Sequence, residues 1–180
     1  MNIILIGYRC TGKSSAGLRL AALLGRPFHD TDELIRRRTG RTVEEIVAAE
    51  GWSVFREEER VVIGDLSGTD GSVIAPGGGA LLDHRNVANL KKNGLFVWVV
   101  ADAATIMRRL ETDPAGGANR PSLSGKPVAD EVREILAERE PLYRRIADLV
   151  VDTASLTAEE VATAICSGLR GKIPPAGKEA

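Results

Sequence analysis

The segment GYRCTGKS, residues 7–14, constrains the fold of this chain more than any other feature. It matches the phosphate-binding pattern G-x-x-x-x-G-K-[ST] at every fixed position. An apolar run at residues 2–6 precedes it, as expected of a buried strand, and residues 15–24 have the pattern of a helix. This context disfavours an ordinary glycine-bearing turn. The segment therefore predicts the first strand–loop–helix unit of an α/β protein with a parallel sheet.

The chemistry of this loop depends on its backbone and on two side chains. Successive N–H groups wrap around phosphates at a helix N-terminus, whose dipole favours anions. Gly7 and Gly12 allow a close backbone approach that a Cβ would obstruct. Lys13 is placed to reach the outer phosphates, and the Ser14 hydroxyl to bind magnesium. We expect the chain to bind ATP or another nucleoside triphosphate together with Mg²⁺.

Composition and charge exclude several other classes of protein. Lys and Arg number 24 against 25 Asp and Glu, so the net charge of −1 gives no general electrostatic case for binding nucleic acid or a membrane. No apolar run approaches the roughly 20 residues needed to cross a bilayer, and the first strand leaves no room for a leader segment. We expect a cytoplasmic monomer. Cys10 and Cys166 lack metal-ligand spacing and are expected to be reduced thiols.

Short β-favouring segments alternate with longer amphipathic ones, as in a parallel sheet with helical crossovers. Asp83 and Asp102 are expected N-caps, and Thr157 is expected to serve as, or lie next to, the cap of the last helix. We expect strands near residues 2–6, 27–30, 72–75, 95–100 and 149–152, and helices near 13–24, 32–38, 43–50, 52–67, 84–92, 103–111, 128–147 and 157–169.

The chain is expected to form one domain over residues 1–170. The turn-rich stretch at 113–121 interrupts the helical pattern, and a mobile flap and an ordinary exposed loop both fit its composition. Residues 171–180 have the composition of a disordered tail. The carboxyl ends of parallel strands share one edge of the sheet, so three segments that follow strands should converge there: the phosphate loop, Asp30 to Asp32, and the glycines at 77–79.

Two of these segments carry candidate acceptor chemistry. If the segment is extended, Asp30 and Asp32 share a face, so one carboxylate would lie near Mg²⁺ and the other against an acceptor hydroxyl. The alternative is that Asp32 caps the next helix. The triple glycine exposes N–H groups to a ligand more readily than a plain turn requires.

Three arginines have two interpretations each. Arg56 and Glu59 lie one helical turn apart, which fits either an exposed ion pair or an arginine that binds an anionic substrate and is steadied by the glutamate. Arg120, in the turn-rich stretch, and Arg139, before Pro141, are equally ambiguous because most arginines are solvated surface residues. Spacing alone leaves the interpretations open.

Together these motifs resemble the shikimate kinase family from residue 3 to about residue 153. The resemblance implies a P-loop kinase three-layer sandwich: a five-stranded parallel sheet in order 2-3-1-4-5, helices on both faces and a mobile lid at about 112–124. It also implies transfer of the γ-phosphoryl group of ATP to the 3-hydroxyl of shikimate, in aromatic amino-acid biosynthesis. The matching pieces are the phosphate loop, Asp30-x-Asp32, Phe55-Arg56-x-x-Glu59, the triple glycine, Arg120-Pro121 and Arg139-x-Pro141-Leu142-Tyr143.

The resemblance also implies a role for each matching residue. Arg56 and Arg139 would hold the shikimate carboxylate, as the planar guanidinium suits. Asp32 would hold the ring hydroxyls and accept the proton of the attacking one, while Gly78 and Gly79 contact the substrate through their backbone. On the nucleotide side, Lys13 and Arg120 would stabilise the transferring phosphoryl group, and Arg109 would lie beside adenine. Ser14 would bind Mg²⁺, with Asp30 acting through the water shell of the ion. The remaining residues of the nucleotide site would be Cys10, Thr11, Gly12 and Ser15.

Three residues depart from the family pattern: Cys10 replaces a usual glycine, Pro76 a small or aliphatic residue, and Ser122 a common leucine. None of them removes a charge or a metal ligand from the expected site. Another small-metabolite kinase, such as a gluconate kinase, is the nearest alternative, and a non-catalytic nucleotide-binding module is a second one. The paired aspartates, triple glycine and two arginines favour a small acidic polyol as acceptor.

Overall fold

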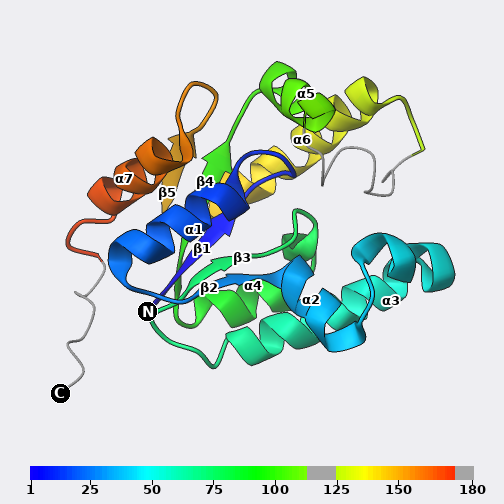
Figure 1. Cartoon of the computed structure of the whole chain (residues 1–180), viewed down its shortest axis with the longest axis horizontal. Helices are drawn as coiled ribbons and strands as arrows, with labels where there is room; N and C mark the ends of the chain where they lie inside the picture. Colours follow the sequence, from blue (N-terminus) through cyan, green and yellow to red (C-terminus); the bar gives the residue numbers. More distant parts are fainter. Residues whose placement is uncertain (113–124, 173–180) are drawn as a thin grey trace.

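A five-stranded parallel sheet forms the centre of the molecule (Figure 1). The computed structural model describes residues 1–112 and 125–172. The strand order is β2-β3-β1-β4-β5, with every neighbouring pair parallel, which confirms the expected topology. The strands are β1 (Asn2–Ile6), β2 (Phe28–Asp30), β3 (Val73–Ala75), β4 (Gly94–Val100) and β5 (Leu149–Asp152).

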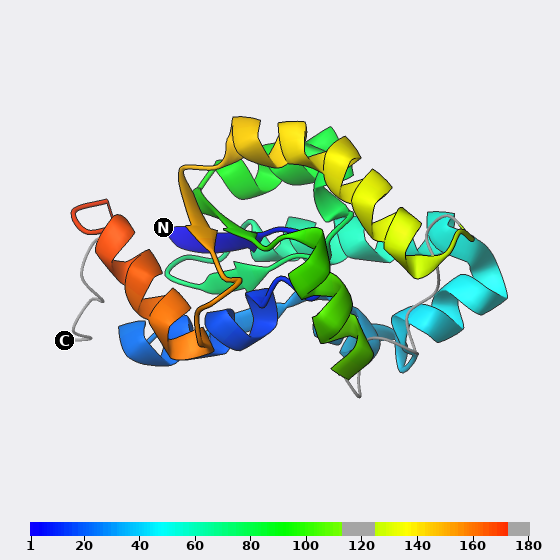
Figure 2. The same cartoon turned by 90° about the horizontal axis from the view of Figure 1, so that it is seen from above.

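Helices cover both faces of this sheet, as expected. Seen from above, α1 and α7 lie on one side of the strands, and α4 and α6 on the other (Figure 2). The helices are α1 (Lys13–Leu24), α2 (Thr31–Thr39), α3 (Val43–Leu66), α4 (His84–Lys91), α5 (Ala103–Thr112), α6 (Val128–Ile146) and α7 (Ala158–Gly168), with a short 3₁₀ helix η1 (Ala80–Leu82).

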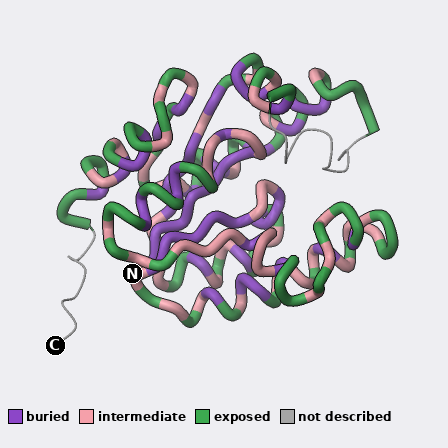
Figure 3. The backbone as a smooth tube through the Cα atoms, viewed as in Figure 1, coloured by how far each residue is buried: buried purple, intermediate pink, exposed green. Residues whose placement is uncertain are grey.

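The alternation of side chains along β1 creates two hydrophobic layers. Ile3 and Leu5 pack with α1 and α7, whereas Ile4 and Ile6 pack with α3, α4 and α6. All of β1 is buried because helices cover both faces, so its sequence is apolar at almost every position (Figure 3). This packing places the loop that follows β1 on a rigid core.

The N-terminal caps follow the sequence, with one correction. Asp83 and Thr157 cap α4 and α7, and the Asp102 carboxylate accepts a hydrogen bond from the N–H of Thr105 in α5. The alternative of an Asp32 cap is wrong: Asp30 caps α2, accepting from the N–H of Asp32 at 3.0 Å. The chain turns into α2 at once, so the two aspartates do not share an extended segment.

The two helices expected at 43–50 and 52–67 are confirmed within α3. They meet at a kink at Gly51, whose φ of 84° and ψ of 172° are not helical. The break turns the first half of the element relative to the second. No helix among residues 1–112 and 125–172 is long and apolar enough to cross a membrane.

Candidate active site

The three segments expected at one edge of the sheet do converge there. The N–H of Gly77 donates to the Thr31 hydroxyl at 2.9 Å, which joins the triple glycine to the start of α2. A Cβ on Gly78 would lie 3.4 Å from the carbonyl oxygen of Gly7, so the triple glycine also touches the phosphate loop. The carboxyl ends of β1, β2 and β3 therefore build one continuous site.

The phosphate loop has the backbone angles that its glycines permit. Gly7 has φ of 146° and lies against the Val99 carbonyl, while Gly12 caps α1 with φ of 97°. Cys10 has φ of 59° and is the only non-glycine with positive φ among the described residues. This left-handed angle explains the glycine common at that position in the resembling family, because a Cβ there costs about 1–2 kcal/mol.

Side chains hold the loop in shape before any phosphate binds. The Thr11 hydroxyl and the Lys13 ammonium both donate to the carbonyl oxygen of Tyr8, each at 2.8 Å. The Thr11 side chain is buried and acts on the loop itself, whereas Lys13 is at the first position of α1, at the mouth of the loop. A bound phosphate would draw the Lys13 ammonium away from this carbonyl.

Ser14 and Asp30 supply the oxygen atoms that a magnesium ion prefers. The Ser14 hydroxyl donates to one Asp30 carboxylate oxygen at 2.6 Å. The other oxygen of that carboxylate caps α2. Within the described part of the chain no cluster of three or more His, Cys, Asp or Glu side chains could hold a metal. The donor set fits Mg²⁺ that retains water and phosphate oxygens as its other ligands.

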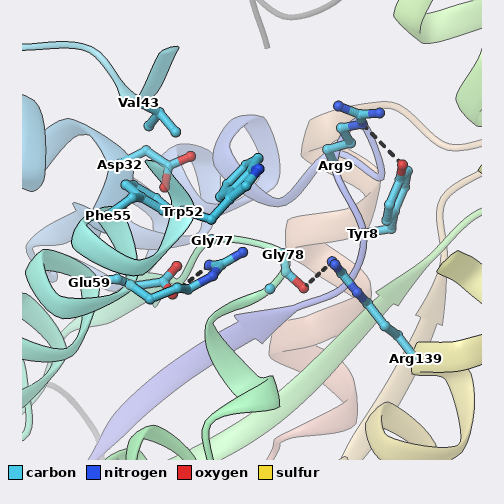
Figure 4. A pocket seen from close by; sticks show the side chains of 12 residues that line it. Tyr8, Arg9, Asp32, Val43, Trp52, Phe55, Glu59, Gly77, Gly78 and Arg139 are labelled. Atoms are coloured by element: carbon cyan, nitrogen blue, oxygen red, sulfur yellow. Dashed lines mark hydrogen bonds and ion pairs between the residues drawn. The ribbon is translucent and has the colours of Figure 1, made fainter. Parts of the chain in front are cut away.

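Beside the loop is a cavity whose wall combines charged and aromatic side chains (Figure 4). Tyr8 and Arg9 stand on one side of it, and Asp32, Trp52 and Phe55 on the other. The complete lining is Tyr8, Arg9, Asp32, Val43, Trp52, Phe55, Arg56, Glu59, Gly77, Gly78, Gly79 and Arg139. Five residues expected to bind an acceptor are in this set, namely Asp32, Arg56, Gly78, Gly79 and Arg139.

Arg56 is fixed by a buried carboxylate and by two aromatic rings. Its Nη1 lies 2.6 Å from Glu59 Oε2, and the Glu59 side chain is 0% exposed. The guanidinium carbon lies 5.3 Å from the Trp52 ring centroid and 5.2 Å from that of Phe55. The structure therefore excludes one of the two interpretations of the Arg56 and Glu59 spacing. The pair is not an exposed surface ion pair, and the glutamate holds the arginine in place.

Burial raises the pKa of Glu59 to about 7, although the Arg56 charge opposes this shift. The second carboxylate oxygen, Oε1, has no hydrogen-bond partner among the described residues. A Cβ on Gly77 would lie only 2.6 Å from that oxygen, so the glycine leaves the space that the buried carboxylate occupies. Burial of the ionised Glu59 carboxylate therefore costs free energy, and the same carboxylate orients the Arg56 guanidinium.

Arg139 reaches the same cavity from α6. Its side chain donates to the Gly78 carbonyl through Nη1 at 2.8 Å, and the Tyr143 hydroxyl donates to the same oxygen at 2.5 Å. Arg139 is 6% exposed, and its Nε has no hydrogen-bond partner within the described residues. Burial raises the pKa of Tyr143, which keeps its hydroxyl a proton donor. The arginine and the triple glycine are therefore positioned together.

A second cavity is also bounded by residues of the phosphate loop, and Arg109 is among the residues that line it. That arginine donates to both oxygens of Thr153, through Nη1 at 3.1 Å and Nη2 at 2.6 Å, and to the Cys10 carbonyl at 3.3 Å. The Thr153 hydroxyl in turn donates to the Thr11 carbonyl at 2.8 Å. The cavity is lined by Cys10, Gly12, Ser15, Ala16, Arg109, Thr112, Thr153, Leu156, Ala158 and Val161.

Sequence reasoning missed part of this constellation. Thr153 joins Arg109 to the phosphate loop, and Trp52 and Arg9 line the acceptor-side cavity, but no motif indicated them. Arg120 lies outside the described residues. So do residues 113–124 of the lid expected at about 112–124, and residues 173–180 of the tail expected at 171–180.

Comparisons with known proteins agree on one family. The family model for shikimate kinase matches residues 9–170. The chain is 48% identical to a shikimate kinase of Syntrophus aciditrophicus (strain SB), over 89% of this chain and 86% of that one. It is 44% identical to shikimate kinase 2 of Enterobacter sp. (strain 638), over 93% and 95%. A solved structure of shikimate kinase from Acinetobacter baumannii in complex with shikimate has a TM-score of 0.88 at 34% identity, over 95% and 93%.

Proposed function

The chain belongs to the shikimate kinase family, and from this premise we propose which of its own residues carry out the reaction. It is an ATP-dependent kinase that transfers the γ-phosphoryl group of ATP to the 3-hydroxyl of shikimate, in aromatic amino-acid biosynthesis. Identity of 48% over most of both chains sets aside gluconate kinase and a non-catalytic module. The observation that carries the assignment of residues is the cavity in which Arg56 and Arg139 face the triple glycine and Asp32.

Arg56 and Arg139 bind the shikimate carboxylate in this proposal. The support is that both guanidinium groups line one cavity and that each is already held in place, Arg56 by Glu59 and Arg139 by the Gly78 carbonyl. Groups that are fixed before binding lose little conformational freedom when the anion arrives. A guanidinium can also bond a carboxylate through two parallel N–H groups, which fixes the orientation of the ring.

Asp32 then holds the ring hydroxyls and accepts the proton of the attacking 3-hydroxyl. Its support is that it lines the same cavity as the two arginines and lies in the first turn of α2. Gly78 and Gly79 present backbone groups to the ring because neither carries a side chain. In particular, a Cβ on Gly79 would overlap the Arg56 guanidinium. The carboxylate and hydroxyl ends of the acceptor are thus recognised by separate groups.

Lys13 stabilises the negative charge that develops on the transferring phosphoryl group, since positioning and charge neutralisation are most of what this chemistry requires. Arg120 is proposed to act with it, on the motif alone. The N–H groups of Cys10, Thr11, Gly12 and Ser15 contribute to the nucleotide site, and Arg109 bounds the cavity proposed for adenine. Ser14 would bind Mg²⁺ directly and Asp30 through water. When bound, that ion would neutralise charge on the β- and γ-phosphates.

We further propose that the enzyme acts as a cytoplasmic monomer, without a nucleic-acid or membrane partner. The near-neutral net charge of −1 supports this proposal. Size-exclusion chromatography with light scattering would test the oligomeric state, for which one chain of 19.2 kDa is expected.

The test of the assignment is ADP release from Mg-ATP with different acceptors. Shikimate should stimulate release, whereas gluconate and CMP should give little. No stimulation by shikimate at about millimolar concentration, a typical upper KM for enzymes, would overturn the activity. Arg139→Ala should raise the KM for shikimate, while the matched control Arg144→Ala, an exposed residue of the same helix paired with Glu140, should not.

A further inference from the structure

Arg9 belongs to the phosphate loop by its backbone and to the acceptor cavity by its side chain. It is the third residue of the segment 7–14, a position that the loop pattern leaves variable. Its guanidinium lines the cavity with Arg56 and Arg139 (Figure 4). The reaction as assigned above uses no group of this side chain, although the side chain is only 12% exposed.

A buried ion pair joins Arg9 to Glu131. Arg9 Nη2 contacts Glu131 Oε1, and the glutamate side chain is 2% exposed. Glu131 lies in the first turn of α6, where the helix dipole favours a carboxylate. The two residues are 122 positions apart in sequence, so the pair ties the start of α6 to the phosphate loop. A buried pair of this kind is sensitive to the loss of either charge.

The Tyr8 ring continues this connection to Arg139. Arg9 Nε donates to the Tyr8 hydroxyl at 3.1 Å, and the guanidinium carbons of Arg9 and Arg139 lie 5.5 Å and 6.0 Å from the centre of that ring. Glu131 and Arg139 are both buried residues of α6. They are about 12 Å apart along its axis at 1.5 Å per residue. The helix is therefore attached to the loop at two points two turns apart.

We propose that Arg9 and Glu131 are positioning residues for the acceptor: their ion pair holds α6 at the register in which Arg139 meets the shikimate carboxylate. The inference rests on the role of Arg139 proposed above. Because the attachment point is the loop that receives the donor phosphates, acceptor geometry is set relative to the donor. Arg139 alone does not set this register, since it donates a hydrogen bond to the Gly78 carbonyl, on a different loop.

The decisive variant is Glu131→Gln, because Glu131 lies outside the phosphate loop. We expect a roughly tenfold rise in the KM for shikimate, which corresponds to about 1.4 kcal/mol. The KM for ATP should change less than about twofold, since the loop glycines and Lys13 are untouched. Glu134→Gln is the matched control: it lies one turn along the same helix in an exposed pair with Lys126, and its kinetics should equal those of the parent. Glu131→Asp, which keeps the charge on a shorter side chain, replaces this variant if the Gln protein does not fold. It should raise the shikimate KM about threefold without a matching rise in the KM for ATP.

The pair is tested as a pair by Arg9→Gln and the double variant. Because both substitutions break the same interaction, their effects should not add. The shikimate KM of the double variant should be no higher than that of the single variant with the larger rise. Arg9→Lys, which retains the charge, should recover most of the affinity. Three results would each overturn the inference: equal rises in the KM for shikimate and the KM for ATP, a fall in melting temperature with unchanged shikimate KM, or a rise in shikimate KM for Arg9→Gln that Glu131→Gln does not share.

Arg139→Ala separates this inference from the proposed function. If it raises the shikimate KM while Glu131→Gln does not, the carboxylate role stands and only the positioning role fails. If Arg139→Ala leaves that KM unchanged, the acceptor assignment itself is wrong, and the positioning role falls with it.

Discussion

The buried carboxylate of Glu59 should make the stability of this protein depend on pH in an unusual direction. Burial raises the pKa of this group from 4.5 to about 7. Between these values the folded chain holds a proton that the unfolded chain has released. Each pH unit in this interval lowers the free energy of unfolding by about 1.4 kcal/mol. Over the full interval the free energy of unfolding falls by about 3 kcal/mol. This stabilisation is fully present below pH 4.5 and is lost above about pH 7.

Glu59→Gln isolates this contribution, because glutamine has nearly the same shape and does not titrate. The free energy of unfolding would be measured by urea titration at pH 5, 6, 7 and 8 for both proteins. Relative to the parent, the Gln variant should gain about 3 kcal/mol between pH 5 and pH 8. Taking the difference at each pH removes the contribution of all other titrating groups. Glu134→Gln, an exposed glutamate, should follow the parent within about 0.5 kcal/mol at every pH.

Two results would refute this reasoning. A difference that stays flat within about 1 kcal/mol would mean that burial and the Arg56 charge cancel at Glu59. A difference of the opposite sign would mean that the ion pair outweighs burial and holds the carboxylate ionised. The same variant should raise the shikimate KM, since Arg56 would lose the charge that orients it.

Three further predictions concern individual positions. Gly79→Ala should raise the shikimate KM roughly 10- to 100-fold by displacing Arg56. Its control is Gly64→Ala, which meets no atom within 4 Å and should add about 0.5–1 kcal/mol of helix stability without changing KM. Cys10→Gly should stabilise the protein by up to about 1 kcal/mol in thermal unfolding, because it relieves the left-handed angle. Thr153→Val should cost about 1–3 kcal/mol and raise the KM for ATP, since the hydroxyl bonds both the phosphate loop and Arg109.

Local patterns predicted the elements of this fold well. The apolar run of β1 and the amphipathic segments that follow it differ enough in period to place strands and helices within a residue or two. The error at Asp30 and Asp32 came from treating the pair as extended. An aspartate at the end of a strand is equally suited to cap a helix, and the three-residue strand β2 left no room for both arrangements.

The sequence by itself determined that a phosphate loop follows the first strand, because all the residues of that motif are consecutive, at positions 7–14. Only the tertiary structure decided that Glu59 is buried and that Arg139 bonds the Gly78 carbonyl, 61 residues away. The same holds for Thr153, which meets Arg109 across 44 residues. Burial and long-range hydrogen bonds depend on how the helices pack on both faces of the sheet. No local spacing encodes that packing, so the arginine that binds and the arginine that is merely solvated look alike until the chain has folded.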